Sequence, residues 1–420
     1  MITNTYLPHV SGVAQSVARF SDVYRKSGHE TLIVAPTYEE QPVHEENVIR
    51  IPAVQHFNGS DLSVVLPVPR LLKNTLHQFS PELIHSHHPF LLGDTALRIA
   101  AARSLPLVYT YHTMYEQYTH YVPVHARNLA NAVIKLTTGY ANLCDHLIAP
   151  SNHVMRLLRD RGVNTPITVI PTGVDTKQYT ENDHKDFRAQ HHIPQEAFVA
   201  GHVGRLAPEK NVVFLAKAAA QFLQEYRDSY FVVAGQGAAQ TEMQQVLRPY
   251  NVDARVRFVG ALHATELMAA YNAFDVFCFA SKSETQGMVL IEAMTAGVPV
   301  IALNVPPVDE VVQDAHNGLL VDNASAPHEF TAALMKFRSL VPERRKHMQF
   351  AARETAQQFD TRHCAMRALS LYETVLDSNV TRNEFDETTW TGLLHVISEE
   401  WKIWANRMAA AAEAVAKEPQ

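Results

Sequence analysis

A loop, a helix and a strand follow one another in Ser281-Lys-Ser-Glu-Thr-Gln-Gly-Met-Val-Leu-Ile-Glu-Ala-Met-Thr-Ala-Gly-Val-Pro-Val300. Strong helix formers with an apolar face run from Met288 to Ala296. Either Ser283 or Thr285 is expected to cap the start of this helix, because a side-chain oxygen there can accept from a backbone N–H group. Gly297 is expected to end the helix, and a buried strand to begin at the next residue.

Two carboxylates flank the start of this helix. Glu284 precedes it and Glu292 lies inside it, with seven residues between them. The backbone N–H groups at the helix start, together with the helix dipole, favour an anion. The residues that would line this anion site are Thr285, Gln286, Gly287, Met288 and Val289. A phosphate bound there, with a glutamate on each side to bind hydroxyl groups, describes a site for a nucleotide sugar.

The same residues resemble a known donor site. Glu284-Thr-Gln-Gly, Glu292-Ala-Met and Gly297-Val-Pro-Val are similar to motifs of retaining glycosyltransferases with the two-domain B-type fold, in glycosyl transferases group 1 and family 4. The loop from His112 to Pro123 is similar to the acceptor-side loop of diacylglycerol glucosyltransferases. The resemblance implies UDP-glucose as donor and a lipid such as diacylglycerol as acceptor. It implies no cofactor beyond the donor and no metal.

The resemblance also assigns roles in the second half of the chain. It implies that Glu292 binds the ribose hydroxyls and that Glu284 binds sugar hydroxyls near C3 and C4. Arg205 and Lys210 lie five residues apart across a turn, so both side chains can reach one anion. In the resembling family their counterparts hold the diphosphate and offset the charge on the leaving nucleotide. The alternative from sequence alone is a pair of solvated cations.

Three features of the first half are open to a functional interpretation. Gly12 opens a helix, either as a plain helix entry or as a backbone contact with the donor diphosphate. His112 follows a strand, and the resemblance implies a hydrogen bond to the donor sugar near its 6-hydroxyl. The alternative is a loop histidine satisfied by its neighbours. His85-Ser-His-His88 could be a metal site or a polar loop, and its spacing favours the loop.

Short apolar strands alternate with helical segments along the chain, which is typical of parallel sheets covered on both faces. The expected fold is α/β: two Rossmann-like parallel-sheet domains facing a cleft, with a C-terminal helical extension. The predicted organisation is an acceptor domain at 1–172, a nucleotide-sugar domain at 173–360, a helix crossing back at 361–380 and an amphipathic tail at 381–420. Ligands of such sheets bind beyond the carboxyl ends of the strands.

Both ends of the chain are unusual. Met1-Ile-Thr-Asn4 is a short first strand, so either the start codon is misassigned or the strand is abbreviated. The tail holds all three tryptophans, Trp390, Trp401 and Trp404, on an apolar helical stripe. This stripe is expected to pack within the chain or in a homodimer, with membrane insertion as the alternative.

Composition excludes several classes of protein. The chain is 46% hydrophobic and 19% charged. No apolar run is long enough to span a membrane, and no signal peptide is recognised. Three cysteines in unrelated apolar contexts are expected to be buried free thiols in a reducing cytoplasm. Residues 1–170 carry 13 Lys and Arg against 12 Asp and Glu, which does not suggest nucleic-acid binding but permits peripheral contact with the inner face of the plasma membrane.

Rival functions remain open at this point. The acceptor could be a glycan or a small molecule, and the donor could be GDP-mannose. A nucleotide-sugar epimerase on the same fold would need several acid and base carboxylates facing the sugar, and only Glu284 is recognised there. A non-catalytic nucleotide-binding scaffold is the third possibility.

Overall fold

The computed structural model of the protein describes residues 1–9, 11–54, 64–65, 69–117, 126–177 and 184–379. The chain divides into two compact units. Unit 1 holds Met1–Gly173 and the chain from Arg362 on, and unit 2 holds Val174–Thr361. The predicted Trp-rich tail at 381–420 lies outside the described residues.

Unit 2 is built on six parallel strands. They are β9 (Phe198–Val203), β10 (Ser229–Ala234), β11 (Val256–Gly260), β12 (Val276–Phe279), β13 (Val300–Asn304) and β14 (Gly318–Asp322). Their order across the sheet is β11-β10-β9-β12-β13-β14. The chain therefore runs from β9 through β10 to β11 at one edge of the sheet. It then returns to β12 on the other side of β9 and runs through β13 to β14 at the opposite edge. This is the strand order of dinucleotide-binding sheets.

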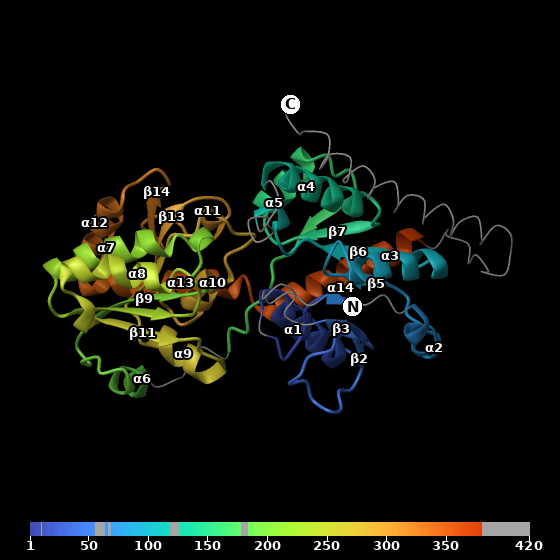
Figure 1. The fold of residues 1–420 in the computed structure, drawn as a ribbon, viewed down its shortest axis with the longest axis horizontal. Helices are drawn as coiled ribbons and strands as arrows, with labels where there is room; N and C mark the ends of the chain where they lie inside the picture. Colours follow the sequence, from blue (N-terminus) through green and yellow to red (C-terminus); the bar gives the residue numbers. More distant parts are fainter. Residues whose placement is uncertain (10, 55–63, 66–68, 118–125, 178–183, 380–420) are drawn as a thin grey trace. The chain divides into compact units, whose positions relative to one another are not determined.

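Helices precede, connect and follow these strands. They are α6 (His184–Gln190), α7 (Val212–Glu225), α8 (Gln240–Leu247), α9 (Ala264–Asn272), α10 (Met288–Thr295), α11 (Val308–Val311), α12 (Pro327–Arg338) and α13 (Pro342–Gln357), with short 3-10 turns η3 (Pro208–Lys210), η4 (Arg248–Tyr250) and η5 (Asp253–Arg255). Right-handed crossovers that run in opposite directions place α7 and α10 on opposite faces. Accordingly α7 packs against α8 and α12, while α10 packs against α13 (Figure 1).

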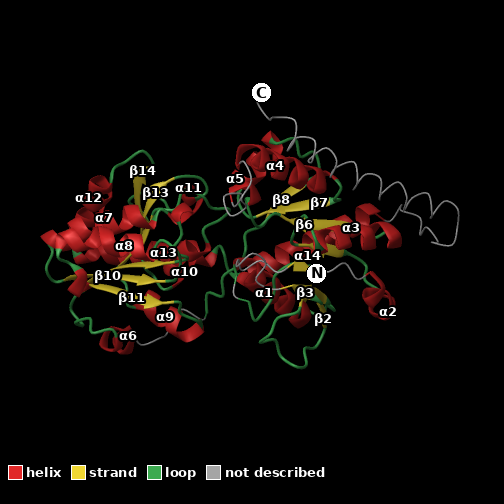
Figure 2. Cartoon of the chain, viewed as in Figure 1, coloured by secondary structure: helices red, strands yellow, loops and turns green. Residues whose placement is uncertain are grey.

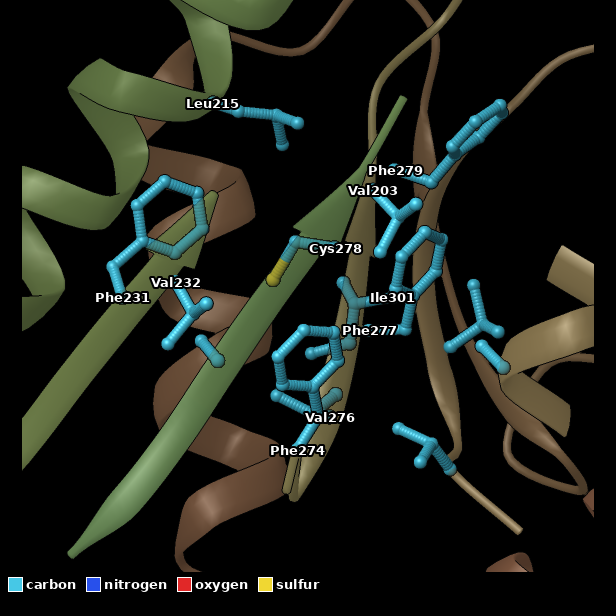
Figure 3. Close-up of a cluster of buried hydrophobic side chains, with 14 of the residues drawn as sticks. Val203, Leu215, Phe231, Val232, Phe274, Val276, Phe277, Cys278, Phe279 and Ile301 are labelled. Carbon is cyan, nitrogen blue, oxygen red and sulfur yellow. The ribbon is translucent and has the colours of Figure 1, made fainter. Parts of the chain in front are cut away.

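The core of unit 2 lies on both faces of this sheet. All four residues of β12 are buried, as expected of a strand covered on both sides. Figure 3 shows Val203, Phe277, Cys278 and Ile301, which project from neighbouring strands of the sheet into this core. Cys278 is a free thiol, as are the other two cysteines, and all three are buried as the sequence predicts. Burial raises the pKa of the Cys278 thiol.

Unit 1 has a second parallel sheet (Figure 2). Strands β5 (Ile84–Ser86), β6 (Leu107–Thr110), β7 (His146–Ala149) and β8 (Ile167–Val169) pair in that order, and β1 (Ile33–Pro36) pairs with β2 (Val48–Ile51). A short antiparallel pair joins β3 (Ala53–Val54) to β4 (Val64–Val65). The helices are α1 (Gly12–Lys26), α2 (Pro69–Phe79), α3 (Leu92–Arg103), α4 (Ala126–Asn142), α5 (Asn152–Asp160) and α14 (Thr361–Asn379).

The first residues of the chain join the two parts of the unit 1 sheet. The Ile2 backbone bridges Val34 of β1 on one side and Ser86 of β5 on the other. The Ile2 amide donates to His85 O at 2.8 Å, and the Thr3 amide donates to Val34 O at 3.0 Å. The predicted first strand is thus reduced to one buried bridging residue at the centre of a continuous parallel sheet.

Helix α14 packs inside unit 1. Its apolar face, including Cys364, Ala368 and Leu369, lies in one cluster with Phe20 of α1 and Val108 of β6. A polar chain accompanies this packing. The Tyr372 hydroxyl lies 2.6 Å from His85 Nδ1 and 3.1 Å from the Tyr24 hydroxyl.

Candidate active site

The predicted donor-site residues of unit 2 fall at one point of the sheet. Strands β9 and β12 are neighbours, and their connections leave toward opposite faces. The loops that follow them therefore diverge at the carboxyl edge, where ligands of such sheets bind. Arg205 and Lys210 lie on the loop after β9, and Glu284 lies on the loop after β12.

Glycines let the loop after β9 approach its neighbour closely. A Cβ atom at Gly235 would lie 1.9 Å from Gly204 O, and one at Gly237 would lie 2.2 Å from Leu206 O. Both distances are shorter than any real contact, so these positions exclude a side chain. Close backbone packing against Gly235 and Gly237 therefore fixes the course of the loop that carries Arg205.

An ion pair joins the two loops. Lys210 Nζ lies 2.6 Å from Glu284 Oε1, with side-chain exposures of 20% and 13%. At this burial a lysine and a carboxylate attract each other more strongly than on an open surface. The structure therefore brings together two residues that the sequence separates by more than seventy positions.

Arg205 has a different partner. Its Nη2 lies 2.6 Å from Glu209 Oε1, in the first turn of the same loop. The Arg205 side chain is 43% exposed and that of Glu209 is 11% exposed, so the guanidinium lies at the surface of the site. Glu209 Oε2 is buried and makes no hydrogen bond within the described part of the chain.

Gly287 precedes helix α10 as its cap, which corrects the prediction. Neither Ser283 nor Thr285 caps the helix. The N-cap is Gly287 with φ of 79°, and no side chain bonds there. A Cβ at this position would lie 2.9 Å from Leu290 Cδ1, so space as well as backbone conformation favours glycine.

The remaining boundaries of this motif are close to the prediction. Helix α10 ends at Thr295, and Gly297 follows with φ of 78°. Strand β13 begins at Val300, two residues after the predicted start. At the helix start Gln286 is buried, whereas Met288 and Val289 are half-buried and pack against the unit 2 core.

Glu292 lies one turn into α10 and is held by a tyrosine. Glu292 is only 7% exposed, and its Oε2 accepts a hydrogen bond of 2.9 Å from the Tyr271 hydroxyl. Tyr271, on α9, is fully buried. A mostly buried carboxylate needs such donors, because an unpaired charge in the protein interior costs about several kcal/mol.

His112 follows β6 in unit 1 and pairs with a second histidine. Its Nε2 lies 2.9 Å from His87 Nδ1, and the rings stack with centroids 5.2 Å apart. Burial lowers the pKa of His112 to about 4 and holds that of His87 well below its usual range. Both imidazoles are therefore neutral near pH 7, with one donating and the other accepting. The predicted role of His112 toward the sugar stays a prediction.

The histidine cluster is only partly the polar loop that the sequence suggests. His85 lies in strand β5, His87 and His88 follow it in a loop, and all three are buried. His85 bonds Thr110 Oγ1 at 2.7 Å, and His88 Nδ1 accepts from the Asn4 amide at 3.1 Å. Within the described ranges no three side chains of His, Cys, Asp or Glu gather to hold a metal ion.

Two further predicted regions lie in unit 1. Gly12 is exposed at the start of α1, where Ser11 Oγ caps the helix by accepting from the Ala14 amide at 3.1 Å. The beginning of the predicted acceptor loop is anchored by Arg161, which donates to Glu116 Oε1 at 2.7 Å and to the Tyr111 hydroxyl at 3.2 Å. Residues 118–125 of that loop lie outside the described residues.

Comparison with known proteins identifies the family. The model described as Glycosyltransferase Family 4 matches residues 10–178, and that described as Glycosyl transferases group 1 matches residues 183–355. A GDP-mannose-dependent alpha-mannosyltransferase of Mycolicibacterium smegmatis is 30% identical over 354 residues, with 83% of this chain and 89% of the relative covered. The chain belongs to these glycosyltransferases. It is a hexosyltransferase, as the sequence predicts.

Other similarities of the glycosyltransferase agree with its fold. An alpha-monoglucosyldiacylglycerol synthase of Streptococcus pneumoniae is 29% identical over 353 residues, covering 83% of this chain and 79% of the relative. Sucrose-phosphate synthase from Thermosynechococcus elongatus has a similar structure, with a TM-score of 0.73 and 22% identity, covering 90% of this chain and 99% of the other. The predicted B-type fold is thereby confirmed. In the described ranges of the glycosyltransferase, no helix is both long and apolar enough to cross a membrane.

One side chain and one ion pair next to the site were not found from the glycosyltransferase sequence. Tyr271 lies in an apolar helical pattern that predicts only core packing, and nothing in the spacing marks its hydroxyl. Glu209 precedes Lys210 in sequence, yet it forms an ion pair with Arg205. The i, i+4 spacing of Arg205 and Glu209 was the available signal, although such pairs are common on surfaces.

Proposed function

We propose that the enzyme transfers glucose from UDP-glucose to diacylglycerol, with retention of configuration at the anomeric carbon. The observation that carries the donor site is the 2.6 Å ion pair between Lys210 and Glu284 at the point where β9 and β12 diverge. The choice of donor sugar and lipid acceptor draws support from the relative in Streptococcus pneumoniae, whose name describes a glucosyldiacylglycerol product.

The two cations are proposed to bind the diphosphate. Arg205 and Lys210 each have a carboxylate partner, Glu209 and Glu284 respectively. A diphosphate presents more negative charge and more acceptor oxygens than either carboxylate, so it competes for both cations. Fixed charges directed at a leaving phosphate stabilise the transition state by roughly 3–4 kcal/mol per donor.

Glu284 is proposed to bind the sugar once Lys210 turns toward phosphate. Its carboxylate would then accept hydrogen bonds from hydroxyls near C3 and C4, while Glu292 accepts from the ribose. Ligand binding thus replaces Lys210 with sugar hydroxyls as the partners of Glu284, and replaces Glu284 with phosphate as the partner of Lys210. Each charged group keeps hydrogen-bond partners, which avoids the cost of an isolated buried charge.

The transfer step itself needs few protein groups. The bond between the anomeric carbon and the β-phosphate oxygen breaks, and its electron pair leaves with UDP. The acceptor hydroxyl oxygen bonds the anomeric carbon on the same face, and its proton passes to the departing phosphate oxygen. In this scheme no carboxylate acts as a nucleophile, and the protein contributes positioning and electrostatic stabilisation.

A GDP-mannose-dependent reaction is the second candidate. It is favoured by the 30% identity to the mannosyltransferase of Mycolicibacterium smegmatis. The two reactions differ in the nucleotide base and in the orientation of the sugar 2-hydroxyl, and the same cation and carboxylate pairs would serve both.

A donor screen tests these proposals. The purified enzyme is incubated with UDP-glucose, UDP-galactose, UDP-N-acetylglucosamine or GDP-mannose, each with diacylglycerol in vesicles, and nucleotide release and glycolipid are measured. We expect α-linked glucosyldiacylglycerol from UDP-glucose alone. A mannolipid from GDP-mannose would favour the second candidate, and an epimerised donor in samples without acceptor would indicate an epimerase. No glycolipid from any donor would contradict the lipid acceptor.

A lipid acceptor also implies work at a membrane surface. We propose that the enzyme is cytoplasmic and binds the inner face of the plasma membrane peripherally through unit 1. Co-sedimentation with vesicles containing anionic lipid, at low and high salt, tests this. Binding that is absent at both salt concentrations would contradict it.

A further inference from the structure

We propose that Tyr271 is a positioning residue for Glu292 and that it sets the preference of the enzyme for a ribonucleotide over a 2′-deoxyribonucleotide. This inference rests on the proposed function, because it takes Glu292 as the group that binds ribose. It adds a residue that does not contact the donor and acts only through the carboxylate.

The contact is short and enclosed. The Tyr271 hydroxyl donates to Glu292 Oε2 at 2.9 Å. Tyr271 is fully buried and Glu292 is 7% exposed, so water competes little for this hydrogen bond. A neutral donor on an ionised acceptor makes one of the stronger hydrogen bonds of a protein interior.

The hydroxyl is held in place by the packing of its ring. Tyr271 makes an edge contact with Phe274 at 6.1 Å between ring centroids and a tilted contact with Phe277 at 5.8 Å. Phe274 is 5% exposed and Phe277 is fully buried. Since aromatic rings in such clusters have few alternative orientations, the position of the hydroxyl is set by the core of unit 2.

The two glutamates of the site therefore have partners of different kinds. Glu284 pairs with the cation of Lys210, for which a diphosphate competes. Glu292 bonds a neutral phenol, for which an anion does not compete. Donor binding is thus expected to change the surroundings of Glu284 and to leave the bond between Tyr271 and Glu292 intact.

A fixed carboxylate can discriminate between sugars of the nucleotide. A ribose presents adjacent 2′ and 3′ hydroxyls, and an ionised carboxylate only accepts hydrogen bonds. Both hydroxyls are bound together only when the carboxylate plane is correctly turned. Glu292 has several rotatable bonds, and one anchored oxygen removes most of that freedom before the ribose arrives.

The test compares binding of nucleotides with and without the 2′-hydroxyl. Calorimetric titrations use UDP, 2′-deoxy-UDP, GDP and 2′-deoxy-GDP with the wild type, Tyr271→Phe and the control Tyr230→Phe. Tyr230 is a half-buried tyrosine of the same unit whose ring packs under the Arg257 guanidinium at 5.2 Å. Thermal melts verify folding of each variant.

We expect the wild type and Tyr230→Phe to bind the ribonucleotide about tenfold more tightly than its deoxy analogue. In Tyr271→Phe that ratio is expected to fall to about two, with the loss confined to the ribonucleotide. A folded Tyr271→Phe that keeps the wild-type ratio, or that loses affinity for both nucleotides equally, would overturn the proposal. A merely structural role would produce the equal loss.

Two outcomes distinguish a failure of the Tyr271 proposal from a failure of the proposed function. If the wild type binds neither UDP nor GDP, the proposed donor site and this inference both fail. If the wild type prefers the ribonucleotide and Tyr271→Phe does not change that preference, only this inference fails. Should Tyr271→Phe not fold, Phe274→Leu replaces it, because this change keeps the hydroxyl but loosens one side of its ring. The same fall in the ratio is expected, and an unchanged ratio contradicts the proposal.

Discussion

At the scale of single residues, the candidate site contains two ion pairs that differ in how they form. Lys210 and Glu284 come from loops that follow different strands, so their 2.6 Å contact depends on the whole sheet being formed. Arg205 and Glu209 come from one turn, and the Arg205 side chain, at 43%, is the most exposed of these four. Exposed pairs contribute about 0–1 kcal/mol to stability, so the positive charge of Arg205 is better explained by ligand binding than by folding.

Replacement of Lys210 separates catalysis from stability. We expect Lys210→Ala to lower kcat/KM for donor transfer at least about 100-fold, because one fixed positive charge on the leaving phosphate is lost. The free energy of unfolding should fall by about 1–3 kcal/mol, since Glu284, whose side chain is 13% exposed, loses its cation. Steady-state kinetics and urea denaturation measure the two quantities. Lys217→Ala, an exposed change on α7, is the matched control. Near-normal turnover in Lys210→Ala would contradict the assignment.

At the scale of elements, the start of α10 is decided by backbone geometry. Gly287 has φ of 79°, a conformation that costs other residues roughly 1–3 kcal/mol. Its added Cβ would also meet Leu290 Cδ1 at 2.9 Å. The loop after β12 therefore turns sharply into the helix, and the first turn of α10 keeps its position beside Glu284.

Gly287→Ala is expected to destabilise unit 2 by about 1–3 kcal/mol and to weaken donor binding, because the first turn of α10 must shift. Urea denaturation and nucleotide titration measure the effects. Gly12→Ala is the control for stability. Gly12 starts α1, and a Cβ there meets no heavy atom within 4 Å in the described residues. If Gly287→Ala is as stable as Gly12→Ala, the strain at the helix start is not real.

How far the sequence predicts these elements depends on what each pattern encodes. The α10 helix is predicted to within one residue at its end, because strong helix formers and a terminal glycine agree there. Its first residue, Met288, is also as predicted, but its cap is missed, because Ser283 and Thr285 satisfy a side-chain capping rule that the backbone at Gly287 overrides. Tyr271 is missed for another reason. Its ring fits an apolar helical pattern, and only the tertiary structure brings its hydroxyl to Glu292.

A second element-scale prediction concerns how α14 is held in unit 1. The Tyr372 hydroxyl lies 2.6 Å from His85 Nδ1 and 3.1 Å from the Tyr24 hydroxyl, in a buried setting. Tyr372→Phe leaves His85 without that partner, so we expect unit 1 to lose about 1–3 kcal/mol. Nucleotide affinity should be unchanged, since Glu292 and Lys210 lie in unit 2. Differential scanning calorimetry and titration measure these outcomes. An unchanged melting profile would show that the hydroxyl chain does not stabilise α14.

At the scale of the whole molecule, the two units differ in how they carry buried imidazoles. Unit 1 holds His85, His87, His88 and His112 close together, and burial lowers the pKa of each. The pKa of His88 falls to about 3 and that of His112 to about 4. In unit 2, burial lowers the pKa of His202 to about 4. Neutral histidines of this kind take up protons when the chain unfolds, so they couple stability to pH.

The direction of that coupling makes unit 1 the more acid-sensitive part. A histidine whose folded pKa lies below its unfolded value of about 6.5 contributes its full stability above pH 6.5 and loses it as the pH falls toward the folded pKa. Each such group can add a slope of about 1.4 kcal/mol per pH unit in that window. Between pH 7.5 and 5.5, calorimetry should therefore show the unit 1 transition falling by at least about 4 °C more than that of unit 2. Tyr372→Phe and Gly287→Ala assign the transitions, because they are expected to lower unit 1 and unit 2 respectively. Equal shifts of both transitions would mean that the clustered imidazoles of unit 1 remain accessible to protons in the folded chain.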